Sequence, residues 1–278
     1  MAMNMAFTIF LVFLSGLFAL ETGSSFQVSE QTPQVKKDRV PVVVELFTSE
    51  GCSTCPPADS LLAQLDSRQP LSSVEVIAIE EHVDYWDQQG WKDPFSSILW
   101  TSRQNDYANV LNSGGAYTPE MVVDGKAEFV GSRGGTALKE IEKAAGIEKT
   151  KVELSEIQVE QNKSFTFKVN VEKPLNLTPK DTPEVILAVT ESGLHSSVKA
   201  GENNGKELQH SAVLRELKAL GAAGKNGQEG FSSRPTVKLD SSWKIENLRL
   251  IVFVQERKSR RILGAAAIHL APQNAASR

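Results

Sequence analysis

The chain has 278 residues, with 30 Lys and Arg against 34 Asp and Glu, which gives a formal net charge of −4. Its apolar fraction of 40% and charged fraction of 23% are ordinary for globular proteins, so the composition excludes a wholly disordered or fibrous chain. The mild acidity offers no basic surface for nucleic acid. Two cysteines are present, Cys52 and Cys55, too few for a disulfide scaffold or a four-cysteine zinc site.

The amino-terminal segment differs from the rest of the chain. Residues 6–20 (AFTIFLVFLSGLFAL) carry no charge, and the run is shorter than the ~20 residues with which a helix spans a bilayer. This pattern is typical of a secretory signal peptide, although the first basic residue, Lys36, follows the run. We therefore expect a signal peptide over 1–24, a linker over 25–39 and an exported, periplasmic or secreted protein without a membrane span in its mature chain. An uncleaved anchor and a buried helix are the alternatives for the apolar run.

Residues 40–148 predict an alternation of strands and helices. The apolar patterns indicate, in chain order, a strand, a helix, a strand, a helix, a hairpin and a helix, over 40–47, 57–68, 74–80, 94–111, 121–130 and 135–145. The first three form a βαβ unit, whose right-handed crossover makes its two strands parallel. The hairpin is indicated by Asp124-Gly125, a strong two-residue turn signal between apolar runs.

The pattern changes after about residue 150. Alternating or apolar runs separated by turn residues predict five strands, over 152–160, 164–172, 183–191, 248–256 and 262–270. A helix is expected within this region, over 207–220. The chain is therefore expected to have an α/β domain over 40–148, a mostly β, sandwich-like domain over 149–272 and a short tail over 273–278.

The two cysteines stand between the first predicted strand and the first predicted helix. A C-x-x-C sequence at this place in a βαβ unit is the thioredoxin-like redox signature, so the α/β domain is expected to be thioredoxin-like. The helix amino terminus favours a thiolate, which would let Cys52 attack a disulfide and Cys55 resolve the product. A purely structural disulfide is the alternative, although a bridge over so few residues removes little entropy from the unfolded chain.

The segment after the second predicted strand carries further candidates. Its strand is expected to end at the same sheet edge as the strand before Cys52, which would bring His82, Tyr85 and Trp86 near the cysteines. His82 would then stabilise a thiolate or bind substrate, and Tyr85 and Trp86 would line a substrate groove. In the alternative metal hypothesis, Cys52, Cys55 and His82 bind Cu(I) or zinc. A structural histidine and aromatic core packing are the simplest alternatives.

Glu45 and the dipeptide Thr118-Pro119 complete the candidate site. Glu45 lies in the first strand, seven residues before Cys52, and is a candidate proton acceptor unless it faces the other side of the sheet. Thioredoxin-like folds place a cis-proline opposite the cysteine pair, at the start of the strand that leads into the terminal hairpin. Thr118-Pro119 stands at that position, so we expect a cis peptide bond there.

Four motifs together resemble a bacterial family of secreted proteins of unknown function that is regarded as thioredoxin-like. They are ELFTSEGCSTCPPAD (45–59), HVDYWDQQGWKDPF (82–95), YTPEMVVDGKAEFVGS (117–132) and GENNGKELQHSAVLREL (201–217). With the cysteine pair, this resemblance leads us to expect an exported thiol–disulfide oxidoreductase without a cofactor. Its partners would be protein thiols and disulfides or a redox partner protein. A Cu(I)- or zinc-binding, metallochaperone-like protein and a non-catalytic interaction module with a structural disulfide are the alternatives.

Overall fold

The computed structural model describes residues 39–160, 163–223 and 229–271. The predicted signal peptide, nearly all of the linker and the tail lie outside these residues. Contacts group these described residues into one compact unit. Within the described part of the chain, no helix has both the length and the apolar character needed to cross a membrane.

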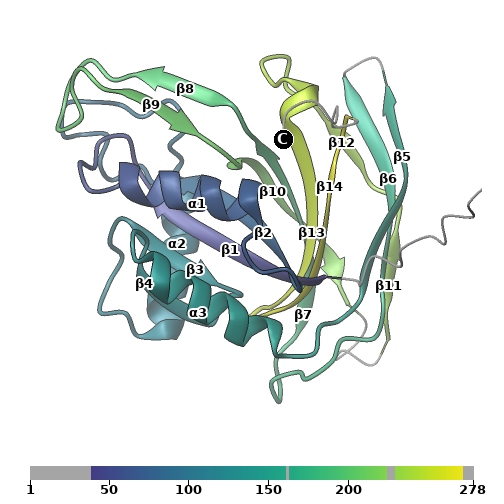
Figure 1. Ribbon diagram of the computed structural model, residues 1–278. Helices are drawn as coiled ribbons and strands as arrows, with labels where there is room; N and C mark the ends of the chain where they lie inside the picture. The colour runs from purple at the N-terminus through teal and green to yellow at the C-terminus, as the bar shows by residue number, and fades with distance from the viewer. Residues whose placement is uncertain (1–38, 161–162, 224–228, 272–278) are drawn as a thin grey trace, which may run out of the picture. The chain divides into compact units, whose positions relative to one another are not determined.

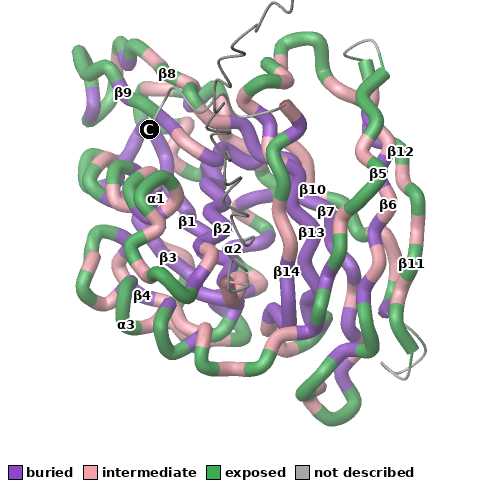
Figure 2. Tube along the Cα trace, turned by 45° about the vertical axis from the view of Figure 1, so that its right-hand side comes forward, coloured by how far each residue is buried: buried purple, intermediate pink, exposed green. Residues whose placement is uncertain are grey.

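A mixed eight-stranded sheet forms the centre of the molecule (Figure 1). Its strands run in the order β14-β13-β7-β10-β2-β1-β3-β4. Their bounds are β1 Val40–Thr48, β2 Val74–His82, β3 Glu120–Val123, β4 Ala127–Val130, β7 Pro183–Glu191, β10 Val213–Ala222, β13 Leu248–Glu256 and β14 Ile262–His269. β1 and β2 are parallel, and their register pairs Thr48 with His82 at the carboxyl end of both strands. β1, β2 and β13 are almost entirely buried (Figure 2).

Three α-helices cover the two faces of the sheet around β1: α1 Pro56–Arg68, α2 Ile98–Leu111 and α3 Gly134–Ala145. Apolar side chains of α1 and α3 pack with Val44 and Leu46 of β1. Trp100 of α2 packs instead with Val43, which points to the opposite face because side chains alternate along a strand. Figure 1 shows this division, with α1 and α3 in front of β1 and α2 behind it.

The remaining strands form two smaller sheets. β5 Val152–Glu160, β6 Ser164–Val171, β11 Phe231–Ser233 and β12 Thr236–Lys238 make one of them. Its side chains, among them Phe165 and Phe167, pack against one face of β7 and β13. β8 Leu194–Ser197 and β9 Glu207–His210 pair as a separate antiparallel hairpin. The segment between them, 198–206, is important for the site described below.

The predicted fold class was wrong. The chain is not an α/β thioredoxin-like domain followed by a sandwich-like domain, because strands dominate it and strands from both halves belong to one mixed sheet. The link is β10, which pairs with β2 through Val213 and Glu80 and then with β7. A strand edge presents unpaired N–H and C=O groups, and the Glu80 N–H of β2 donates to the Ala212 carbonyl oxygen at this junction. Apolar periodicity shows which segments are extended but not which segments pair.

Local predictions had different outcomes. The hairpin was confirmed, with Asp124 and Gly125 both at positive φ, 47° and 63°, but its loop has three residues, 124–126, because Val123 pairs with Ala127. The helix predicted over 94–111 begins only at Ile98, where the Ser97 side chain accepts a hydrogen bond from the Leu99 N–H. The helix predicted over 207–220 was wrong, because that stretch forms β9 and most of β10. Pairing with β7 along most of β10 outweighs the weak helical spacing of its leucines.

Candidate functional site

Cys52 and Cys55 form a disulfide bond at the amino terminus of α1. Cys55 is the N-cap residue and Pro56 is the first residue of the helix, where a missing N–H costs no intrahelical hydrogen bond. The two cysteines are 1% and 0% exposed, whereas Ser53 and Thr54 between them are exposed. The bridge therefore lies at the positive end of the helix dipole, just beneath the surface.

A distant segment covers the cysteine loop. The side-chain amide of Asn203, in the 198–206 segment, donates hydrogen bonds to the carbonyl oxygens of Glu50 (2.8 Å) and Cys52 (2.9 Å). The neighbouring Glu202 carboxylate accepts a hydrogen bond from the Ser53 N–H at 3.0 Å. Asn203 is fully buried and Glu202 is exposed. The Asn203 hydrogen bonds to the cysteine loop are therefore shielded from solvent, whereas the Glu202 hydrogen bond is not.

Five buried side chains form what we call the two-histidine cluster: Glu50, Glu80, His82, Asp93 and His210. His82 has Nδ1 2.7 Å from Asp93 Oδ2 and Nε2 3.1 Å from Glu80 Oε1. His210 has Nδ1 2.8 Å from the same Glu80 oxygen and Nε2 3.1 Å from Glu50 Oε1. Each imidazole therefore bridges two carboxylates, and all five side chains are inaccessible to solvent.

Glu50 joins this cluster to the cysteine loop, since it stands two residues before Cys52. Its backbone N–H donates to Asp93 Oδ2 at 2.8 Å, and its carboxylate accepts a hydrogen bond from Trp91 Nε1 at 2.7 Å. Its carbonyl oxygen is one of the two that accept from Asn203. The ends of β1 and β2 and the 198–206 segment thus meet at one residue.

The electrostatics of the cluster follow from these pairings. Burial opposes ionisation of Glu80, but hydrogen bonds from His210 and His82 outweigh it and lower the pKa of Glu80 to about 2. Burial likewise opposes charge on the imidazoles, yet the charge of Asp93 holds the pKa of His82 well above its usual range. Hydrogen bonds to Glu50 and Glu80 raise the pKa of His210 to about 9. The cluster is therefore a compensated set of buried charges.

Asp59 is a functional candidate that the sequence reasoning missed. It follows Cys55 by one helical turn, with its N–H bonded to the Cys55 carbonyl oxygen at 3.1 Å. Its buried carboxyl group accepts a hydrogen bond from Thr48 Oγ1 at 2.6 Å. Burial, together with the charge of Glu80, raises the pKa of Asp59 to about 7. Its spacing of four residues from Cys55 on one helix face was the available signal.

The structure places Trp86, Thr118 and Pro119 beside the start of α1. The Thr118-Pro119 peptide bond is cis, as expected. Trp86 Nε1 donates to Thr118 Oγ1 at 2.8 Å, and a Cβ atom added to Gly51 would lie 3.0 Å from Trp86 Cβ. Pro119 lies near the first turn of α1, with Gly131 between them. A Cβ atom built on Gly131 would lie 3.3 Å from Pro119 Cβ and 3.2 Å from Ala58 Cβ.

Tyr85 lies at the edge of this group. Its hydroxyl group donates to Gln104 Oε1 at 3.2 Å, and the residue is 37% exposed. His82 is at the expected sheet edge, but its ring nitrogens face Asp93 and Glu80 rather than a sulfur atom.

Glu45 is not brought to the cysteines. It points to the face of the sheet opposite α1, where its carboxylate binds Arg103 Nε at 2.6 Å and the Tyr107 hydroxyl group at 2.5 Å. This is the orientation that the strand alternation left open, and it separates Glu45 from the Cys55 side of β1.

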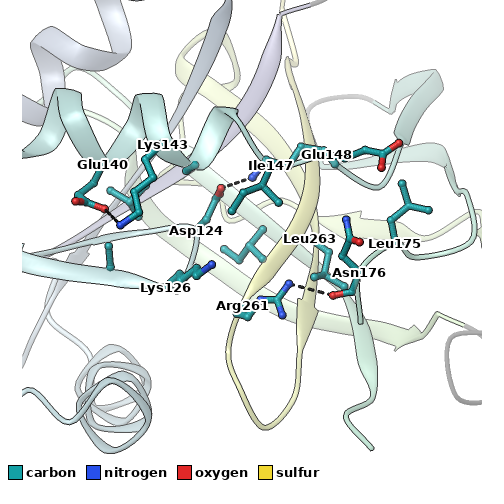
Figure 3. Close-up of a pocket in the computed structure, with 15 residues that line it drawn as sticks. Asp124, Lys126, Glu140, Lys143, Ile147, Glu148, Leu175, Asn176, Arg261 and Leu263 are labelled. Atoms are coloured by element: carbon teal, nitrogen blue, oxygen red, sulfur yellow. Dashed lines mark hydrogen bonds and ion pairs between the residues drawn. The ribbon is translucent and has the colours of Figure 1, made fainter. Parts of the chain in front are cut away.

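A pocket lies at the opposite end of β1 from the cysteine loop (Figure 3). It has a volume of about 110 Å³ and is lined by residues of the β3–β4 hairpin, α3 and the start of β14. Asp124, which lines the pocket, exchanges two hydrogen bonds with Val43 of β1. Val43 is five residues before Thr48, which is about 17 Å along the strand. Lys149 pairs with Asp124, and Arg261 donates to the Asn176 carbonyl oxygen. The pocket is therefore remote from the disulfide.

Comparison with known proteins relates the chain to a family of unknown function and to two solved structures. The family described as "Protein of unknown function (DUF1223)" matches residues 43–255. A crystal structure of a protein from Agrobacterium tumefaciens is similar, with 23% identity, 85% of this chain and 97% of that chain covered, and a TM-score of 0.60. The structure of HBP35 of Porphyromonas gingivalis has 15% identity, covers 87% of this chain and 81% of that chain, and has a TM-score of 0.61. These two likenesses concern the fold alone. No curated protein matches the chain.

Proposed function

This chain belongs to the DUF1223 family of proteins of unknown function, and we propose that it is an exported thiol–disulfide oxidoreductase that uses Cys52 and Cys55. The observation that carries the proposal is the disulfide itself, closed over two residues at a strand–helix junction with Cys55 as the N-cap. The partners would be protein thiols and disulfides or a redox partner protein. No cofactor is needed, because the cysteine pair carries the two electrons.

The proposed exchange has two balanced steps. In the reduced protein, the Cys52 thiolate attacks a substrate disulfide, forms a mixed disulfide and releases one substrate thiolate. The Cys55 thiolate then attacks the Cys52 sulfur, which restores the internal disulfide and releases the second substrate thiolate. The same steps in reverse oxidise a substrate dithiol, and the released thiolates take their protons from water or a nearby acid.

Two features beside the disulfide support this chemistry. The amino terminus of α1 stabilises a thiolate on either cysteine through its unpaired N–H groups and dipole. Asp59, one helical turn after Cys55, has a carboxyl group whose pKa of about 7 suits proton exchange near neutrality. In this proposal Asp59 takes the proton of Cys55 as it becomes the attacking thiolate.

The cysteines are buried in this structure, and in this proposal the 198–206 segment, which is bonded to the cysteine loop, moves to admit a protein substrate. Asn203 and Glu202 hold that segment on the cysteine loop by side-chain contacts to Glu50, Cys52 and Ser53. Trp86 lies next to the loop and would contact an arriving substrate, and the partly exposed Tyr85 beside it in sequence would extend that surface.

A redox titration against glutathione tests the proposal. We expect a reduction potential in the range of catalytic pairs, from about −120 to −270 mV, and turnover of a test disulfide. A potential below about −300 mV without turnover would show a structural bridge and refute the proposal. In a second test, Cys55→Ala should trap partners as mixed disulfides on Cys52, whereas a Cys52→Ala/Cys55→Ala control should trap none.

A further inference from the structure

We propose that Glu80, His82 and His210 form a binding site for one divalent transition-metal ion of the zinc type. The three ligand atoms are Glu80 Oε1, His82 Nε2 and His210 Nδ1. This inference is independent of the redox proposal, because it uses no sulfur atom and rests on side chains from β2 and β9.

The ligand atoms already have nearly the spacing that zinc requires. Glu80 Oε1 lies 3.1 Å from His82 Nε2 and 2.8 Å from His210 Nδ1, and the candidate ligand atoms of the three residues are all within 4.8 Å of one another. Zinc bonds of about 2.0–2.1 Å in tetrahedral geometry place ligand atoms about 3.3 Å apart. Small side-chain adjustments would therefore admit an ion between them.

The second ring nitrogen of each histidine is held as in known metal sites. His82 Nδ1 contacts Asp93 Oδ2, and His210 Nε2 contacts Glu50 Oε1. Metal-binding histidines characteristically donate their other N–H group to a carboxylate, which fixes the tautomer and the ring orientation. Two such carboxylate–histidine pairs converge here on one shared carboxylate.

The orienting carboxylates are themselves fixed. Asp93 Oδ2 also accepts the Glu50 N–H, and the second oxygen of Glu50 accepts the indole N–H of Trp91. Glu80 Oε2 accepts the Ser211 N–H at 3.1 Å, which leaves Oε1 as the oxygen directed at both rings. The cluster thus has three inner groups and a rigid outer set, with a fourth coordination position left for water or a ligand.

Phe95 links the two histidines to the lining of an open cavity. Its ring packs against the imidazoles of His82 and His210, with ring centroids 5.3 and 5.5 Å apart. Phe95 also lines an open cavity of about 340 Å³, together with Arg215 and Trp243. Rotation of this one ring would connect the histidines with solvent, which an exchangeable ion requires.

The test is metal binding by the oxidised full-length protein after chelator treatment. Titration with Zn²⁺ and Co²⁺ should give one ion per chain. The Co²⁺ complex should show d–d absorption without a thiolate-to-cobalt charge-transfer band. Absence of binding by the oxidised wild-type protein would overturn the inference, and so would binding of cobalt through sulfur.

Variants identify the ligands. His82→Asn and His210→Asn should abolish binding, and Glu50→Gln or Asp93→Asn should weaken it about 10- to 100-fold. His195→Asn, an exposed histidine of β8, is the matched control and should bind normally. If the ligand variants do not fold, Glu50→Gln decides, because unchanged affinity in this isosteric variant would contradict the proposed orienting role.

Cys52→Ser/Cys55→Ser separates this inference from the redox proposal. The double variant should lose disulfide exchange and keep the metal. Loss of the metal in this variant would show a thiol site instead and overturn the inference. A redox-inactive wild-type protein that still binds one ion would refute the proposed function alone.

Discussion

The contact of Asn203 with the cysteine loop leads to a quantitative prediction. Its amide group donates to the carbonyl oxygens of Glu50 and Cys52, and Lys206 Nζ donates to its Oδ1 at 2.8 Å, which orients the amide. Asn203→Ala removes both hydrogen bonds and leaves the 198–206 segment attached at the loop by the exposed Glu202–Ser53 contact. The segment should then uncover the disulfide more often.

The size of the effect follows from the two lost bonds. A neutral hydrogen bond contributes about 0.5–1.5 kcal/mol net, so the two together hold the segment by about 1–3 kcal/mol. That range corresponds to a shift of about 5- to 150-fold in the closed-to-open equilibrium. If reduction needs the open form and opening is fast, the rate of reduction rises by the same factor.

Reduction by dithiothreitol, followed by the release of free thiols, measures this rate. Asn203→Ala should react about 5- to 150-fold faster than the wild-type protein. Asn203→Asp should react at least as fast, because it places an acceptor oxygen against two carbonyl oxygens. Asn204→Ala, which changes the exposed neighbour, is the control and should react at the wild-type rate. Equal rates for Asn203→Ala and wild type, with an intact fold by circular dichroism, would refute the reasoning.

Three further predictions concern buried ionisable groups. Asp59→Asn should remove the inflection near pH 7 from the pH profile of disulfide reduction, because the carboxyl group that exchanges the Cys55 proton is lost; an unchanged profile removes Asp59 from the mechanism. Arg103→Met should lower the free energy of unfolding by about 3–5 kcal/mol in urea at pH 7, since it leaves the buried charge of Glu45 unpaired, and a loss below about 1 kcal/mol would contradict this account. Burial raises the pKa of Glu120 from 4.5 to about 7, so the folded chain keeps a proton that the unfolded chain loses between these values. The free energy of unfolding of the wild-type protein should therefore fall as pH rises through this interval, and that of Glu120→Gln should not. If the two proteins differ in free energy of unfolding by the same amount at pH 5 and at pH 8, the shift is contradicted.

Part of the candidate site was accessible from local sequence patterns. A β-branched run followed by turn residues and prolines located the end of β1, the cysteine loop and the start of α1. The parallel pairing implied by a βαβ unit placed His82 at the same sheet edge as Thr48. These inferences succeeded because they depend on periodicity, capping and crossover handedness, which operate over a few tens of residues at most.

Other parts of the site depended on contacts between distant segments. His210 meets Glu50 across 160 residues of sequence, and Asn203 meets Cys52 across 151. Nothing local to either residue encodes these contacts, because the β8–β9 hairpin is carried to the cysteine loop by the pairing of β10 with β2. The side to which Glu45 points was also decided by Arg103 and Tyr107 of α2.

The sequence by itself determined the cysteine pair, its position at a helix start and the Asp124-Gly125 turn. These features arise from short-range stereochemistry, in which one residue restricts its neighbours. Tertiary structure alone decided that one mixed sheet runs through both halves of the chain and that two histidines share Glu80 beneath the cysteine loop. Strand partners and buried charge pairs are chosen by the free energy of the whole fold, because satisfying a sheet edge or a buried carboxylate depends on groups that local periodicity does not identify.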